Sequence, residues 1–186
     1  MKILKNGRSC RVAKLKIAGQ LIVIKHYRRK SFWHGFTRLW RPSRAARCWY
    51  YAHLLEMHGI ATPKPLAIIE KRWGWLRRDA YFISAFYPAP SLWDYMTSQK
   101  IDAPSWEKLQ KSWQELEQRL VDAKLEHGDN KAHNFLVSEH ELILLDLDSM
   151  RQHRCKWMLN RVRARDQERF LRSWNDYPEI KAKWCV

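Results

Sequence analysis

The stretch EHGDNKAHNFLVSEHELILLDLDSM, residues 126–150, carries the strongest indication of the fold of this chain. Three of its polar residues stand out by their spacing: Asp129, then Asn134 five positions later, then Asp146 after the apolar run 142–145. Phosphoryl transfer needs a carboxylate beside the acceptor hydroxyl and oxygen ligands for the magnesium that bridges the nucleotide phosphates. A loop carrying Asp129 and Asn134, followed by a hairpin strand that delivers Asp146, supplies both. We therefore interpret this stretch as a catalytic and metal-binding loop.

Three neighbours of these residues have less specific patterns. His127 is expected to support the loop by hydrogen bonding, and His133 is expected to be a solvated loop residue. Asp148 either assists Asp146 or caps the next turn. An isolated Asp129 would be read as a turn residue, because aspartate is common in turns. Its combination with Asn134, a hydrophobic strand and the sequence DLD is much more specific.

Length and composition favour a single folded domain over residues 1–186. Hydrophobic residues make up 46% and aromatic residues 13% of the chain, which excludes a disordered tail. No apolar run approaches the roughly 20 residues that span a bilayer, and the N-terminus lacks the apolar region of a secretory signal, so we expect a cytoplasmic protein. Its four cysteines are scattered and form no CxxC pair, which favours reduced thiols over zinc or disulfides.

The net charge of +16 predicts an anionic partner. Basic residues concentrate in Arg28–Arg47, where they alternate with aromatic residues and no acidic residue occurs, and in Arg151–Arg165. Nucleic acid, anionic lipid headgroups and a phosphorylated glycan all fit such charge, which does not choose among them. For Arg28–Arg47, two alternatives stay open: a surface for an anionic partner, or an exposed loop whose aromatic residues pack on a sheet.

The N-terminal half predicts an antiparallel sheet with one helix. Strands are expected at residues 3–4, 12–17, 21–24, 66–69 and 80–86, with a charged hairpin turn over 70–79 and a helix over 45–58. Lys25 closes the apolar strand 21–24, where it would neutralise nucleotide phosphates. A glycine-rich phosphate loop is absent, and Gly7 alone remains near its place. Glu56 is the only acidic residue of the helix and is expected at the surface.

The C-terminal half predicts a reduced helical lobe. Pro88 and Pro90 are typical of a hinge between lobes. Helices are expected over 92–96, 106–125 and 166–174, and the remaining chain is too short for an activation segment with substrate-binding helices. The expected fold is therefore α+β: an antiparallel-sheet N-terminal lobe (about residues 1–88) and a compact C-terminal lobe (about residues 89–186).

Four phrases of the chain resemble the lipopolysaccharide kinase family, the bacterial Kdo and core-heptose kinases with a protein-kinase-like fold. They are VIKHY (23–27), SRAARCWYYAHLLEMHGIATPKPLAIIE (43–70), HGDNKAHNFLV (127–137) and LLDLDSM (144–150). The resemblance implies ATP and Mg²⁺ as cofactors and transfer of the γ-phosphate to a heptose or Kdo hydroxyl of the lipopolysaccharide inner core. It also implies work at the cytoplasmic face of the inner membrane. By motif, it makes Lys25 the phosphate contact, Asp129 the catalytic base, and Asn134 and Asp146 the metal ligands.

Three functions remain as alternatives on the sequence. The first is a sugar kinase of lipopolysaccharide core assembly, whose partners are the core glycolipid as substrate and an anionic membrane surface. The second is a small atypical kinase that acts on a protein or an RNA-associated complex. The third is a catalytically degenerate kinase fold that binds a polyanion such as nucleic acid or a membrane. Magnesium-dependent ATP turnover separates the first two functions from the third.

Overall fold

The computed structural model describes residues 2–7, 9–28, 42–74, 76–98, 101–139 and 141–185. Most of the basic and aromatic segment Arg28–Arg47 lies outside these residues, so both interpretations of it stay predictions. The chain divides into two compact units. The first contains Met1–Leu54 and Pro63–Tyr87, and the second contains Leu55–Thr62 and Pro88–Val186.

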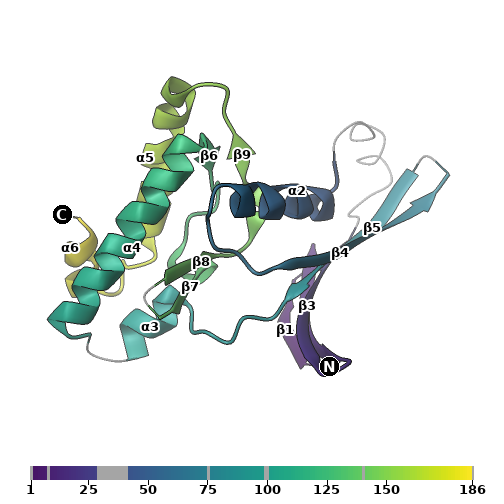
Figure 1. Cartoon of the computed structure of the whole chain (residues 1–186), viewed down its shortest axis with the longest axis horizontal. Coiled ribbons are helices and arrows are strands. Elements are labelled where there is room, and N and C mark those ends of the chain that lie inside the picture. Colours follow the sequence, from purple (N-terminus) through teal and green to yellow (C-terminus); the bar gives the residue numbers. More distant parts are fainter. Residues whose placement is uncertain are drawn as a thin grey trace. The chain divides into compact units, whose positions relative to one another are not determined.

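The first unit is built on a five-stranded antiparallel sheet (Figure 1). Its strand order is β1-β2-β3-β5-β4, which places β3 at the centre. The strands are β1 (Lys2–Asn6), β2 (Cys10–Ile17), β3 (Gln20–Tyr27), β4 (Pro65–Trp73) and β5 (Leu76–Ala85). Lys25 therefore lies on the central strand, between Val12 of β2 and Phe82 of β5. The prediction of five antiparallel strands is confirmed.

Helix α2 (Arg44–Met57) packs on the sheet through small residues. Ala45, Cys48 and Ala52 are fully buried, and the Tyr27 hydroxyl lies 3.2 Å from Cys48 Sγ. Side chains alternate between the two faces of a strand, so Lys25 points to the same face as Tyr27. That face carries α2. Glu56 lies in the last turn of α2 and is exposed, as expected.

The predicted charged turn over residues 70–79 is wrong. β4 continues to Trp73 and β5 begins at Leu76, so most of this interval is paired strand. Charge does not prevent strand pairing here because the backbone makes the ladder, while the charged side chains of Lys71, Arg72 and Arg78 are exposed. Arg72 and Glu70 even form an ion pair of 2.8 Å along β4.

The second unit packs helices against a short hairpin (Figure 1). The hairpin consists of β7 (Phe135–Ser138) and β8 (Glu141–Leu144), as the sequence predicts. The segment after α2 is held to it, because Leu144 N–H donates to Ala61 O (2.8 Å) and Thr62 Oγ1 donates to Leu144 O (2.8 Å). The other elements are α3 (Leu92–Ser98), α4 (Ala103–Asp122), β6 (Leu125–Glu126), η1 (Ala132–Asn134), η2 (Leu147–Ser149), β9 (Arg151–Gln152), α5 (Lys156–Arg172) and α6 (Pro178–Trp184).

Helix α4 begins earlier and ends earlier than predicted. Asp102 caps its N-terminus by accepting a hydrogen bond from Ser105 N–H, and the bonds from Ser105 lower the pKa of the Asp102 carboxyl. The helix ends at Asp122, and Leu125 enters β6, which pairs with β9. Hydrogen bonds from Gln118 and Lys156, 3.0 Å each, lower the pKa of the Asp122 carboxyl. The bond from Lys156 ties the end of α4 to the start of α5.

Helix α5 begins ten residues before the predicted Asp166. Its first half lies within the basic segment Arg151–Arg165, which contains neither proline nor glycine to stop a helix. Leu159 and Phe170 are buried on one side of α5, and Trp174 beyond its end is buried completely. A helix can therefore bury one stripe while its opposite side stays strongly basic. No helix in the described part of the chain is long and apolar enough to cross a membrane.

Candidate active site

The loop between β6 and β7 brings Asp129 and Asn134 into direct contact. Asn134 Nδ2 donates to the main-chain oxygen of Asp129 (2.7 Å) and to its carboxylate Oδ2 (3.3 Å). Lys131 Nζ lies 2.8 Å from the other carboxylate oxygen, Oδ1. The Asp129 side chain is 29% exposed. A carboxylate with both oxygens engaged and one side open is held in a fixed orientation yet remains accessible to a reactant.

His127 connects this loop to the strand that precedes Asp146. Its Nε2 lies 2.8 Å from Leu145 O, and its Nδ1 lies 3.3 Å from Asp129 N. A carbonyl only accepts and a main-chain N–H only donates, so Nε2 carries the hydrogen and Nδ1 accepts. The neutral imidazole satisfies both bonds at once. The expectation that His127 supports the loop by hydrogen bonding is confirmed.

Gly128 allows the loop to pass close to the segment after Asp146. Its φ of +78° lies in the left-handed region, and a Cβ added there would stand 2.5 Å from Ser149 O. No side chain fits in that space. Glycine is therefore required at position 128 for two reasons: the positive φ of the backbone and the lack of space for a Cβ.

Helix α5 holds the loop from behind through the Gly128 peptide groups. Asp166 Oδ2 accepts from Gly128 N–H at 2.9 Å, and Arg169 Nη1 donates to Gly128 O at 2.6 Å. Asp166 and Arg169 are themselves paired at 3.1 Å. Ser173 Oγ, just past the helix, accepts from Ala132 N–H at 3.2 Å. Both polar groups of one glycine are therefore bound by one ion pair.

Sequence reasoning missed Asp166, Arg169 and Ser173. The available signal was the position of Asp166 on the apolar stripe of a helix, four residues before Phe170 and seven after Leu159. Asp166 is only 7% exposed. A carboxylate at a buried position requires a partner, which is what the loop provides.

Asp146 lies two residues after the end of β8, in a left-handed backbone conformation with φ of 59° and ψ of 56°. Asn134 is tied to the same place, because Leu145 N–H donates to Asn134 O at 2.8 Å. The two predicted metal ligands thus flank a shared main-chain contact. Asp148 is buried and accepts from Ser149 Oγ at 3.2 Å, which fits a structural role better than a second metal ligand.

The oxygen atoms at this place suit magnesium. Asn134 uses its Nδ2 on Asp129, so its amide is oriented with Oδ1 as the remaining donor atom for a cation. Asp146 adds a carboxylate. In the described part of the chain, no three or more His, Cys, Asp or Glu side chains gather as a metal cage. Magnesium needs none, because protein sites often supply one or two oxygen ligands and the substrate phosphates supply others.

Two more candidates belong to other elements of the fold. Lys25 belongs to the first unit, where it is half-buried on β3. His133 is exposed, as expected for a solvated loop residue, and its ring stacks on Trp93 of α3 with 4.9 Å between centroids. This stacking packs η1 against α3. Among the described residues, no recorded hydrogen bond or ion pair joins His133 to the Asp129 carboxylate.

Comparisons with known proteins bear on the family and the fold of the chain. The family model "Lipopolysaccharide kinase (Kdo/WaaP) family" matches residues 3–185. Among solved structures, "WaaP in complex with acyl carrier protein" matches with a TM-score of 0.63 and 17% identity, over 93% of this chain and 77% of that chain. A sequence comparison with curated proteins finds no match. The predicted α+β, protein-kinase-like fold is confirmed.

The Gly128 contact generates a prediction about stability. We expect Gly128→Ala to destabilise the protein more than Gly19→Ala, measured as the free energy of unfolding in urea. Both glycines have positive φ, but nothing lies within 4 Å of the Gly19 position, whereas Ser149 O lies 2.5 Å from the Gly128 position. Gly19→Ala should cost about 1–2 kcal/mol for the backbone alone. Equal costs for the two variants would contradict the close approach.

Proposed function

We propose that this chain, which belongs to the lipopolysaccharide kinase (Kdo/WaaP) family and is therefore a kinase, phosphorylates a sugar of the lipopolysaccharide inner core. In this proposal it transfers the γ-phosphate of ATP, with Mg²⁺, to a heptose or Kdo hydroxyl. The observation that carries the proposal is the Asp129 carboxylate, oriented by Asn134 and Lys131 and left partly open to solvent.

In the proposed reaction Asp129 orients the acceptor hydroxyl and takes its proton. Its anchoring by Asn134 and Lys131 fixes the carboxylate before the acceptor arrives, so less of the binding energy is spent on ordering it. The Lys131 ammonium would also offset the negative charge of the transferring phosphoryl group. Lys25, half-buried on the central strand of the first unit, is proposed to contact the nucleotide phosphates.

Asn134 and Asp146 are proposed to hold the magnesium ion. When bound, Mg²⁺ neutralises charge on the nucleotide phosphates. Asp146 has a left-handed backbone conformation, which aspartate adopts more readily than most residues. Asp146 sits at the end of a buried strand, which keeps its main chain fixed.

A membrane-bound acceptor would require the enzyme to approach the cytoplasmic face of the inner membrane, and one surface of α5 supports this. Trp157 and Met158 are 65% and 43% exposed there, and the Arg161 guanidinium lies 5.0 Å from the centroid of the Trp157 ring. We call Arg154, Lys156, Trp157, Met158, Arg161 and Arg165 the α5 surface. Tryptophan among cationic residues is typical of contact with an anionic lipid interface. We propose peripheral association through this surface.

The assignment of Asp129 is tested by its isosteric variant. Asp129→Asn should lower radiolabel transfer from ATP to purified deep-core lipopolysaccharide by about a hundred- to ten-thousand-fold, because proton transfer by a positioned base contributes that much. Asp122→Asn is the matched control, since its side chain is 57% exposed at the end of α4. Equal transfer by wild type and Asp129→Asn would refute the catalytic role.

The same assay distinguishes the alternative functions. Core lipopolysaccharide, RNA and a generic protein substrate are offered in parallel. Magnesium-dependent labelling of the glycolipid alone supports the sugar kinase. Labelling of protein or RNA but not glycolipid would favour the atypical kinase, and no ATP turnover with any acceptor would favour a degenerate fold that only binds a polyanion.

The metal assignment is tested by Asp146→Asn. Asparagine tolerates the left-handed conformation, so the fold should persist while the carboxylate is lost. We expect the Mg²⁺ concentration for half-maximal ATP binding to rise more than about ten-fold. Loss of a group that only hydrogen-bonds to a metal ligand already weakens metal binding by about ten-fold or more, and loss of a ligand should cost more. Glu139→Gln is the control, because Glu139 also has positive φ but lies exposed in the β7–β8 turn. Unchanged Mg²⁺ dependence in Asp146→Asn would exclude it as a ligand.

Membrane association is tested with vesicles containing phosphatidylglycerol. Arg161→Ala and Arg165→Ala should each weaken binding about five-fold, because one basic residue near an anionic surface contributes about 1 kcal/mol. Trp157→Ala should weaken binding even at high salt. Salt screens the electrostatic attraction of the basic residues but not the burial of an apolar ring. Tyr50→Ala, 54% exposed in the first unit, is the aromatic control. Equal binding of all these variants would remove the α5 surface from the proposal.

A further inference from the structure

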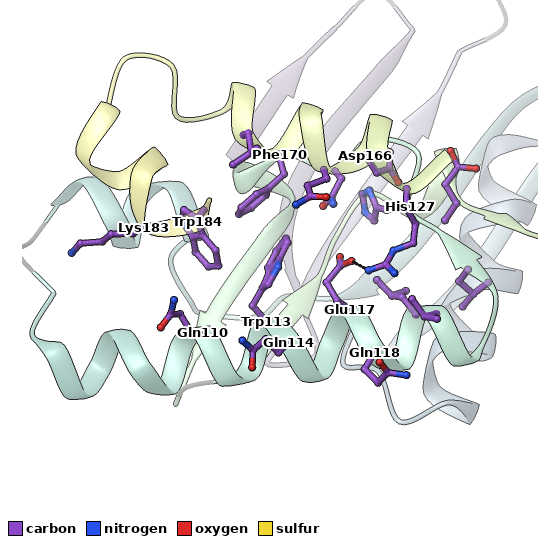
Figure 2. Close-up of a pocket in the computed structure, with 18 residues that line it drawn as sticks. Gln110, Trp113, Gln114, Glu117, Gln118, His127, Asp166, Phe170, Lys183 and Trp184 are labelled. Carbon is purple, nitrogen blue, oxygen red and sulfur yellow. Dashed lines mark hydrogen bonds and ion pairs between the residues drawn. The ribbon is translucent and has the colours of Figure 1, made fainter. Parts of the chain in front are cut away.

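The whole excess of positive charge belongs to the first unit. Its sequence, Met1–Leu54 and Pro63–Tyr87, holds 19 Lys and Arg residues and only two acidic residues, Glu70 and Asp79. The second unit holds 16 Lys and Arg residues and 17 Asp and Glu residues. Charges there also pair, as Glu117 and Arg163 do at 2.9 Å beside the pocket of about 410 Å³ between α4 and α5 (Figure 2). The first unit therefore attracts an anionic partner most strongly.

The five-stranded sheet of the first unit is apolar on the face opposite α2. Directly paired residues of neighbouring strands point to the same face, so the register shows which side chains share it. Tyr27, whose hydroxyl lies 3.2 Å from Cys48 Sγ, marks the face that carries α2 (Figure 1). Ile24 lies three positions earlier and points to the opposite face. Its row takes one apolar residue from each of the five strands: Ile3, Ala13, Ile24, Ile83 and Ala67.

Two further rows enlarge this apolar surface. One contains Leu15, Ile22 and Ala85, and the other pairs Ile69 with Tyr81. Ile17 follows Leu15 on the same face. We call these residues and the row of Ile24 the outer face. Its members at three of its borders are strongly exposed: Ile3 on edge strand β1 by 56%, Ile17 at the end of β2 by 55%, and Ile69 on edge strand β4 by 50%.

The face that carries α2 is the more polar of the two. Its row beside that of Ile24 contains Lys2, Lys14, Val23, Ser84 and Pro65. An antiparallel sheet with one solvated face normally has its apolar residues on the packed face and its polar residues on the other. The first unit reverses this pattern. In its described part α2 is the only helix, so packing within the unit does not explain the outer face, and a large exposed apolar patch marks an interaction site.

Basic side chains lie at one end of the outer face. Arg11 is exposed and pairs in register with His26, in the row of Tyr81. Lys71 Nζ lies 5.8 Å from the centroid of the Tyr81 ring. The carboxylate of Asp79 lies 3.2 Å from His26 Nε2. An apolar surface bordered by cations matches an anionic lipid interface, whose headgroups attract the cations and whose acyl chains take up the apolar side chains.

The composition of the first unit distinguishes a membrane from two other occupants. A second copy of the chain would bring together two units that each carry 19 basic and two acidic residues, and these units repel each other. Protein partners are held mainly by Trp, Tyr and Arg side chains. The only aromatic residue of the outer face is Tyr81, and the others are Ile, Leu and Ala.

We propose that the outer face docks on an anionic phospholipid membrane, with Ile3, Ile17 and Ile69 entering the boundary between headgroups and acyl chains. This site depends neither on the proposed reaction nor on the α5 surface, which belongs to the second unit.

The proposal is tested by cosedimentation of the full chain with vesicles made of equal parts of phosphatidylglycerol and phosphatidylcholine. The triple variant Ile3→Thr, Ile17→Thr and Ile69→Thr keeps β-branched side chains at exposed strand positions, so the sheet should fold. We expect it to bind these vesicles more than about ten-fold more weakly than the wild type, because each apolar group that enters the membrane adds affinity. The wild type should bind vesicles of phosphatidylcholine alone more weakly, since neutral headgroups do not attract its cations.

Leu21→Thr is the matched control. Leu21 is 41% exposed on β3, but it lies three positions before Ile24 and therefore on the face that carries α2. Its vesicle binding should equal that of the wild type, whereas the single variants Ile17→Thr and Ile69→Thr should each lose about three-fold. These single variants carry the test if circular dichroism shows that the triple variant is unfolded. An equal loss in Leu21→Thr and Ile17→Thr would indicate insertion of the β2–β3 hairpin tip and overturn docking through the outer face.

Sedimentation velocity without vesicles tests for self-association. We expect the wild type to be monomeric. A concentration-dependent dimer that the triple variant does not form would identify a second copy as the occupant and overturn the lipid proposal. Vesicle binding by the folded triple variant equal to that of the wild type, or no binding by the wild type, would also overturn it and leave an acidic protein as the occupant that the charge allows.

Discussion

The ion pair of Asp166 and Arg169 is the constraint on which the proposed catalytic loop depends. A loop that carries the proposed general base must be rigid, yet most residues of the loop 127–134 are polar. Here one carboxylate takes the Gly128 N–H and one guanidinium takes the Gly128 carbonyl. Bonds to charged groups are stronger than bonds between neutral ones, particularly at low exposure. The two peptide groups on either side of the Gly128 Cα are both held, and the second of them fixes the main chain of Asp129.

The close approach of Gly128 to Ser149 completes this constraint. The segment that follows Asp146 passes directly against the loop, where a Cβ would not fit. His127 adds a second link by bonding Leu145 O and Asp129 N–H with one neutral ring. The proposed base Asp129 and the proposed metal ligand Asp146 are therefore positioned by the same few contacts. A change at Gly128 or His127 moves both.

The sequence predicted the parts of the site that are close together along the chain. Asp129, Asn134 and the hairpin leading to Asp146 occupy fewer than 25 residues in a fixed order, and the first two are in contact. Asp166 and Ser173 lie about 40 residues later. Aspartate and serine are common on any helix surface, so the role of these two residues depended on how α5 packs. The start of α5 was missed for a related reason. A strongly basic run carries little apolar periodicity, and its helical state comes from packing a few residues such as Leu159.

Helix α5 carries different tasks on its two sides, and helical geometry explains how. Residues seven and four apart share a side, which places Leu159, Asp166 and Phe170 together on the buried side of the helix. Trp157, Arg161 and Arg165 follow one another at intervals of four on the opposite side, where they are exposed. The helix is rigid across its width, so a surface that docks on the outer side fixes the orientation of the inner side. If the α5 surface binds the membrane, the catalytic loop is held at a defined position above it, because the same helix bonds Gly128.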